Sequence, residues 1–117
     1  MRTRADSMET NFNPVEDAAA LERLLTHSKE EPVLLFKHSS TCPISARAYR
    51  QMQGIKSPVS IVVVQQSRDL SREVAARTGV QHETPQALVL RHGKAVWSAS
   101  HFDITADAVE QAMRENE

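Results

Sequence analysis

The stretch that most constrains the fold is an apolar run, Val33–Lys37, followed by a short polar loop and then by Cys42 and Pro43. The apolar run has the character of a buried strand. Proline is favoured in the first turn of a helix, where its missing N–H costs nothing. The sequence therefore predicts a strand, a loop and a helix that begins at Pro43. Cys42, the only cysteine of the chain, is expected at the mouth of that helix.

This expected position gives Cys42 a chemical property. Unpaired backbone N–H groups and the positive end of the helix dipole favour an anion at a helix N-terminus. A thiolate is such an anion, so we expect a reactive thiol. The alternative is that Cys42 is a small buried hydrophobe, which is what most free cysteines are. The polar loop and the helix start around Cys42 favour the reactive interpretation.

The spacing from Cys42 to Ser45 is that of a C-x-x-C redox motif with serine in place of the second cysteine. Ser45 cannot form a disulfide. Its hydroxyl could hydrogen-bond the thiolate, or it could simply lie on the first turn of the helix.

Composition limits the function classes. A chain of 117 residues is one domain, and a net charge of −1 gives no reason to expect nucleic acid or a membrane as the main partner. A single cysteine excludes an intramolecular disulfide and a Cys-rich zinc site. No apolar run approaches the length of a transmembrane helix, and the first residues lack the apolar core of a secretory signal. We therefore expect a cytoplasmic protein in a reducing compartment.

Periodicity predicts the order α-β-α-β-α-β-β-α. The first helix is expected to open at Asn13-Pro14, as N-cap and first helical residue. Residues 1–12 are expected to be a flexible N-terminal tail and residues 13–117 a single domain. The other expected elements are a strand at 33–37, a helix from 43 to 54, a strand at 59–64, a helix from about 67 to 79, strands at 86–91 and 95–98, and a helix from Thr105.

This order has a topological consequence. The first two strands are joined through a helix, so they should be parallel with a right-handed crossover. The last two are separated by the turn His92-Gly93-Lys94 and should form a hairpin. The expected fold class is α/β, a mixed four-stranded sheet with helices on both faces. The reactive loop would leave the carboxyl end of the first strand, where α/β sheets place their ligands.

This arrangement resembles the thioredoxin fold in its shorter, glutaredoxin-like form. The cysteine at the first strand–helix junction matches, and so does Thr84-Pro85 before the hairpin. The resemblance implies that Pro85 is cis and lies beside Cys42. It also implies that Thr84 offers its backbone to an extended thiol substrate.

A closer resemblance is to the monothiol bacilliredoxins, the YtxJ-like proteins of the bacillithiol system. It spans roughly residues 13–113, and the run Thr41-Cys42-Pro43-Ile44-Ser45 is its most specific part. The family commonly has serine where this chain has Thr84. Other similar segments are Phe36-Lys37-His38-Ser39, Thr84-Pro85-Gln86-Ala87, Gly93-Lys94, Val96-Trp97, Ser100-His101 and Ile104-Thr105.

The resemblance implies a thiol–disulfide oxidoreductase that removes bacillithiol from S-bacillithiolated proteins through a mixed disulfide on Cys42. It implies bacillithiol as a thiol co-substrate, no tightly bound cofactor, and regeneration by bacillithiol or by a disulfide reductase. Cys42 would be the catalytic residue, and Thr84 and Pro85 would bind substrate. Active-site support would come from His38, Thr41, Pro43, Ile44 and Ser45.

Two other functions stay open at this point. One is a non-catalytic thioredoxin-like stress or binding module with a quiet cysteine. The other is a monothiol glutaredoxin-like iron–sulfur carrier, although such carriers typically show Cys-Gly-Phe-Ser where this chain has Pro43-Ile44. We expect no metal site, because His38 and Cys42 straddle a loop without acidic neighbours. Arg47 and Arg50 could meet a carboxylate-bearing thiol or simply be solvated.

Overall fold

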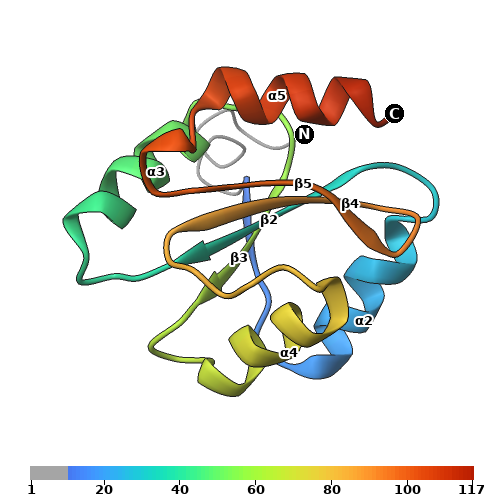
Figure 1. Ribbon diagram of the computed structural model, residues 1–117, viewed down its shortest axis with the longest axis horizontal. Helices are drawn as coiled ribbons and strands as arrows, with labels where there is room; N and C mark the ends of the chain where they lie inside the picture. Colours follow the sequence, from blue (N-terminus) through green and yellow to red (C-terminus); the bar gives the residue numbers. More distant parts are fainter. Residues whose placement is uncertain (1–10) are drawn as a thin grey trace, which may run out of the picture.

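The computed structural model describes residues 11–117 as one five-stranded sheet between two pairs of helices (Figure 1). The strand order across the sheet is β1-β3-β2-β4-β5. In the described part of the chain, no helix is long and apolar enough to cross a membrane. The elements are β1 (Phe12–Pro14), α2 (Ala18–His27), β2 (Val33–His38), α3 (Pro43–Gln53), β3 (Val59–Val63), α4 (Arg68–Thr78), β4 (Gln86–Arg91), β5 (Lys94–Ser100), η1 (His101–Asp103) and α5 (Ala106–Glu115).

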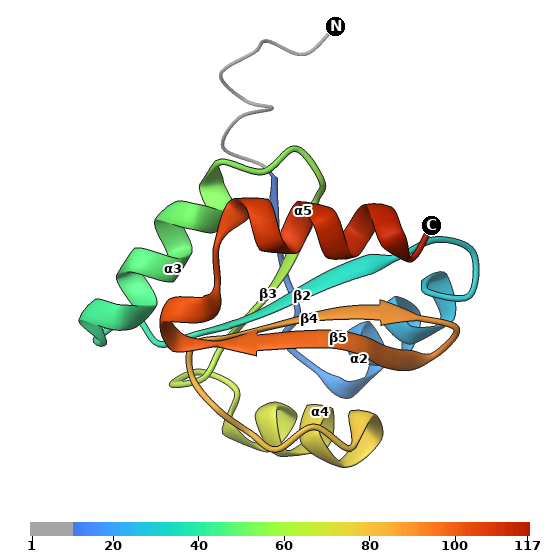
Figure 2. The same cartoon turned by 45° about the horizontal axis from the view of Figure 1, so that its top comes forward.

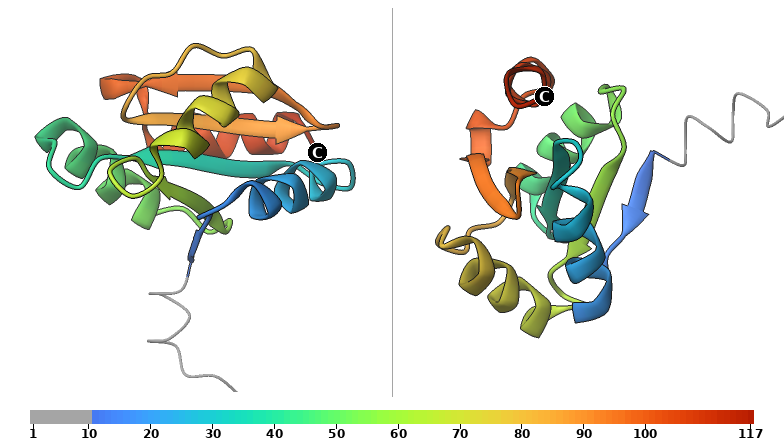
Figure 3. Two further views of the ribbon diagram at one scale, coloured as in Figure 1. Left: turned by 90° about the horizontal axis from the view of Figure 1, so that it is seen from below. Right: turned by 90° about the vertical axis from the view of Figure 1, so that its right-hand side faces the viewer.

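The central strand β2 is buried on both faces, as its apolar sequence predicts. Alternate side chains point to opposite faces of a strand. Leu34 and Phe36 therefore belong to the core under α3 and α5, whereas Val33 and Leu35 belong to the core under α2 and α4. Figures 2 and 3 show the two helix pairs on opposite sides of the sheet.

The predicted strand pairings are confirmed. β2 runs parallel to β3 and antiparallel to β4, and β4 pairs with β5 in a hairpin. The hairpin turns at His92 and Gly93, with φ of 58° and 75°. Positive φ at both central residues is what a two-residue hairpin turn of this hand requires. The mixed sheet with helices on both faces is therefore as expected.

The prediction for the start of the first helix is wrong. Phe12–Pro14 forms the edge strand β1, which pairs in parallel with β3, so the sheet has five strands and not four. Proline is tolerated on an edge strand because its missing N–H faces away from the ladder. Helix α2 begins later, after Asp17, whose carboxylate accepts a hydrogen bond from the Ala20 N–H at 2.8 Å. The Asn-Pro pattern resembled a helix start but belongs to a strand.

The predicted tail, residues 1–12, includes two residues that belong to the folded domain. Its first ten residues lie outside the described part of the chain. Asn11 and Phe12 are part of the folded domain: the Val59 N–H donates to the Asn11 carbonyl at 2.7 Å. The Phe12 ring lies 4.7 Å from the ring of Tyr49 on α3, centroid to centroid. The described domain therefore includes residues 11 and 12.

The position of the α2 cap can be tested by mutation. Asp17→Ala removes the side-chain acceptor of the Ala20 N–H and should lower the free energy of unfolding by about 1 kcal/mol. Asn13→Ala, at an exposed position on β1, should change it by less than about 0.5 kcal/mol. Urea denaturation followed by circular dichroism measures both. A larger loss for Asn13→Ala than for Asp17→Ala would place the cap at Asn13.

Candidate active site

Cys42 lies where the sequence predicts, as the N-cap of α3 on the loop that leaves β2. Its backbone is extended, with φ −103° and ψ 124°, and its carbonyl accepts the first helical hydrogen bond from the Ala46 N–H at 3.0 Å. The thiol is free, and the residue is half-buried. Cys42 is thus a partly exposed residue at the N-terminus of a helix, where the unpaired N–H groups point toward it.

Ser45, the residue in place of a second cysteine, is fully buried. Its Oγ accepts a hydrogen bond from the Ser39 N–H at 2.9 Å and lies 2.8 Å from His38 Nδ1. Among the contacts of residues 11–117, neither partner of this hydroxyl is Cys42. The sequence left two roles open for Ser45, and the structure supports its position in the first turn of α3. Its hydroxyl bonds the loop residues His38 and Ser39 and does not bond the thiol of Cys42.

His38 is the other half of this interaction. Its ring stacks on Phe36, with centroids 5.6 Å apart, and lies 4.9 Å from the ring of Tyr49. Burial lowers the pKa of His38 below its ordinary 6.5, so the ring is neutral at pH 7. A neutral imidazole supplies little positive charge to a nearby thiolate. His38 supports the site mainly by holding Ser45 and packing against α3.

Gln65, just after β3, is a site residue that sequence reasoning missed. Its Nε2 donates to Ser39 Oγ at 2.7 Å and to Thr41 Oγ1 at 3.1 Å, and its Oε1 accepts from the Ser40 N–H at 3.2 Å. The sequence could have pointed to Gln65, because β2 and β3 were predicted to be parallel. The carboxyl ends of parallel neighbours meet at one edge, so a polar residue after β3 lies beside the loop after β2.

Thr84 and Pro85 come to the same edge of the sheet. They precede β4, which is antiparallel to β2 with Lys37 opposite Gln86, so they lie at the carboxyl end of β2 as Cys42 does. The Thr84–Pro85 peptide bond is cis, in agreement with the resemblance. The Pro85 carbonyl accepts from the His101 N–H at 3.1 Å. The site therefore combines the loop 38–45 with the segment 82–85.

The connector before Thr84 is tied to the site by its own side chains. His82 Nε2 lies 3.3 Å from Thr84 Oγ1, and Glu83 pairs with His101 at 3.4 Å. Beneath this connector lies Lys37, which is fully buried and whose Nζ has no hydrogen-bond partner among residues 11–117. Burial lowers the pKa of Lys37 to about 8, an effect that the charge of Glu83 partly offsets. Sequence reasoning did not predict this burial and placed Lys37 only at the end of an apolar strand.

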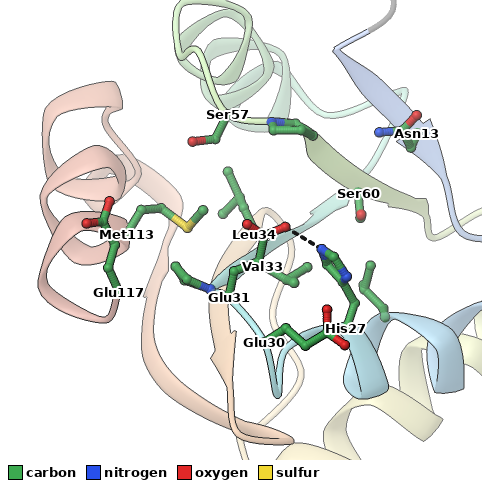
Figure 4. Close-up of a pocket in the computed structure, with 13 residues that line it drawn as sticks. Asn13, His27, Glu30, Glu31, Val33, Leu34, Ser57, Ser60, Met113 and Glu117 are labelled. Carbon is green, nitrogen blue, oxygen red and sulfur yellow. Dashed lines mark hydrogen bonds and ion pairs between the residues drawn. The ribbon is translucent and has the colours of Figure 1, made fainter.

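A cavity of about 670 Å³ does not include Cys42 or Pro85 among its lining residues. Figure 4 shows the residues that line it. Its walls include Val33 and Leu34 at the start of β2, whereas Cys42 follows the end of that strand. The cavity and the thiol are therefore at opposite ends of the sheet. Within residues 11–117, His, Cys, Asp and Glu form no group of three that could hold a metal ion.

A free thiol at a helix N-terminus, with a cis-proline at the same edge of a mixed sheet, defines the class of thioredoxin-fold thiol redox proteins. Solved structures agree. A thioredoxin-fold protein described as a proposed oxidoreductase is 35% identical, with a TM-score of 0.83 over 90% of this chain and 96% of its own. Thioredoxin from Trypanosoma brucei brucei is 14% identical, with a TM-score of 0.72 over 98% of this chain and 96% of its own. Fasciola hepatica thioredoxin is also 14% identical, with a TM-score of 0.70 over 90% and 99%.

The family is more specific than the fold. A family model described as "Monothiol bacilliredoxin BrxC" matches residues 13–109. The chain therefore belongs to the monothiol bacilliredoxin family, and its general function is thiol redox chemistry.

The buried hydroxyl of Ser45 can be tested for a structural role. Ser45→Ala leaves the Ser39 N–H and His38 Nδ1 without their partner and should lower the free energy of unfolding by roughly 1–3 kcal/mol. Ser40→Ala, at an exposed position of the same loop, should cost less than about 0.5 kcal/mol. Urea denaturation under reducing conditions gives both values. Equal stability of Ser45→Ala and wild type would show that the hydroxyl does not fasten the loop.

The lowered pKa of His38 predicts a pH dependence of stability. The unfolded chain binds a proton near pH 6.5 and the folded chain only at lower pH, so the stability from this group is complete above 6.5 and is lost as pH falls below it. The pKa of His82 is also lowered, so its contribution to stability changes with pH in the same direction. Lys37 has a pKa of about 8, so below that pH it is protonated in both the folded and the unfolded chain and adds no pH dependence to the stability. His38→Asn should reduce the slope of unfolding free energy between about pH 7 and 5. The control variant His92→Asn, at an exposed position, should keep the wild-type slope. An unchanged slope in His38→Asn would show that His38 is not the source of the pH dependence.

Proposed function

We propose that this protein removes bacillithiol from S-bacillithiolated proteins. The observation that carries the proposal is one half-exposed thiol at the N-terminus of α3, next to a serine whose side chain is committed to the loop. A chain without a resolving cysteine cannot complete an internal disulfide. Its thiol must therefore hand the bound group to an external thiol, as a monothiol cycle requires. The family to which the chain belongs supports the choice of bacillithiol.

The proposed cycle has two exchange steps. The Cys42 thiolate attacks the bacillithiol sulfur of the capped protein, a new S–S bond forms, and the protein cysteine leaves as a thiolate that takes up a proton. Cys42 now carries bacillithiol as a mixed disulfide. In the second step a bacillithiol thiolate attacks the bacillithiol sulfur of this adduct, which yields bacillithiol disulfide and restores the Cys42 thiolate. Each step exchanges one disulfide for another, so no further oxidant is needed.

The residues around the thiol have supporting roles in this cycle. Thr41, Pro43 and Ile44 form the helix start that presents the sulfur. The half-buried Thr84, which precedes β4, would offer its backbone to an extended substrate, as a strand edge does to a peptide. A disulfide reductase is an alternative second-step partner, acting directly or through bacillithiol. A cycle that consumes a small thiol fits a reducing cytoplasm.

Two alternatives have less support. A non-catalytic binding module would not require an accessible thiol at a helix N-terminus. An iron–sulfur carrier would need the cysteine to ligate a cluster, and Pro43-Ile44 stands where such carriers have Gly-Phe. A brown colour on anaerobic purification would support the carrier instead.

The nucleophile is the direct test of the proposal. Cys42→Ser should lower removal of bacillithiol from a capped reporter protein to background, because a hydroxyl forms no useful anion at neutral pH. Ser40→Ala, in the same loop, should retain the wild-type rate. Mass spectrometry of the reporter over time measures cap loss, and intact mass of wild type should show one bacillithiol adduct. Removal by Cys42→Ser at the wild-type rate would exclude Cys42 as the nucleophile and favour the binding module.

A further inference from the structure

A cavity of about 400 Å³ lies beside the active-site loop, between the start of α4 and the connector that precedes β4. Its volume falls in the range of small-molecule sites, roughly 300–1,000 Å³. No residue of the proposed exchange chemistry lines it. The lining residues are Val64, Gln65, Arg68, Ser71, Arg72 and His82.

Two of the cavity walls contact the two halves of the active site directly. Gln65 donates a hydrogen bond to Thr41, the residue before Cys42, at 3.1 Å. His82 lies within 3.3 Å of the hydroxyl of Thr84, on the other side. The cavity therefore borders both parts of the site, the loop that carries Thr41 and the segment that carries Thr84.

The cavity also has a positive character. Arg68 and Arg72 are exposed on the first turns of α4, and Arg72 is paired with one carboxylate, Asp69, at 2.8 Å. His82 adds a polar ring. The buried ammonium of Lys37 acts on that ring: after burial itself, its charge is the next cause that lowers the pKa of His82. Glu83 opposes the effect of Lys37 on His82, so the attraction for an anion comes mainly from the two guanidinium groups that line the cavity.

We propose that this cavity binds the carboxylate-bearing part of the small thiol co-substrate, with Arg72 and Arg68 as the anion-binding side chains. The inference rests on the proposed function, because it assigns a binding site to the bacillithiol that Cys42 removes. Arginine suits the task because its planar fork matches a carboxylate in a bidentate manner. The selectivity of the protein for a carboxylate-bearing cap over a neutral one would then come from α4 and not from the Cys42 loop.

Another arginine competes for this role on α3. The Arg47 guanidinium lies over the Phe102 ring, 5.4 Å from its centroid, on the side of the site formed by η1. Arg47 lines neither the cavity at α4 nor the hollow beside η1 that Phe102 lines, whereas Arg68 and Arg72 line the cavity at α4 together. We therefore place the anion at α4 and leave α3 as an outcome of the test.

The experiment compares two arginines of the same helix. Arg72→Gln removes a charge and an ion pair at the cavity, and Arg77→Gln removes a charge and an ion pair with Glu22 near the other end of α4. Each variant is assayed on one peptide capped either with bacillithiol or with 2-mercaptoethanol, which carries no carboxylate. Arg72→Gln should raise KM for the bacillithiol cap about tenfold and leave the mercaptoethanol cap unchanged. Arg77→Gln should change neither.

The outcomes separate this inference from the proposed function. If wild type fails to remove the bacillithiol cap, the proposed function falls. If wild type removes it and Arg72→Gln and Arg68→Gln leave KM unchanged, the function stands and the cavity is not the anion seat. An equal rise in KM for both caps, or an equal effect of Arg77→Gln, also overturns the inference. A cap-selective rise for Arg47→Gln alone would move the seat to α3.

Discussion

The pairing of β2 with its two neighbours is the constraint on which the site depends. β3 is parallel to β2 and β4 is antiparallel to it, so the loops after β2 and β3 and the segment before β4 meet at one edge of the sheet. Cys42, the proposed nucleophile, comes from the first loop, Gln65 from the second and the cis-proline from the third segment. A register shift of one residue in either pairing would turn the central strands' side chains to the wrong face and separate these groups.

Side-chain hydrogen bonds then fix the loop that the sheet brings into place. The backbone N–H groups of Ser39 and Ser40 have no strand partner, and each is satisfied by a side chain, Ser45 and Gln65 respectively. A loop with satisfied backbone groups keeps one conformation at little cost. Ser45 of the Cys-x-x-Ser motif therefore has a structural role, which is to hold the loop before Cys42. In this chain, a cysteine in place of Ser45 would weaken the hydrogen bonds to the Ser39 N–H and to His38 that hold the loop.

The residues that the sequence predicted well are those set by local rules. The buried strand β2, the proline at the start of α3 and the glycine of the hairpin turn each follow from spacing and conformational preference. The edge strand β1 was missed because it is short, polar and contains proline, and only its pairing with β3 makes it a strand. Gln65 was missed for the same reason: its importance comes from a partner 24 to 26 residues away. Tertiary contacts of this kind leave no periodic signal in a single sequence.

Lys37 shows how far such contacts can work against local preference. The buried ammonium of Lys37 has no hydrogen-bond partner in the described part of the chain and costs stability, so an apolar side chain of similar length would fit the strand better. The pattern of β2 would favour that replacement, since the same face carries Val33 and Leu35. The charge acts instead on the connector above it, on Glu83, which precedes Thr84 and the cis-proline, and on His82, which lines the cavity at α4. The buried charge of Lys37 thus lies close enough to this connector to act on both of its charged or titratable side chains, Glu83 and His82. The stability lost in burying Lys37 is offset in part by its attraction to Glu83.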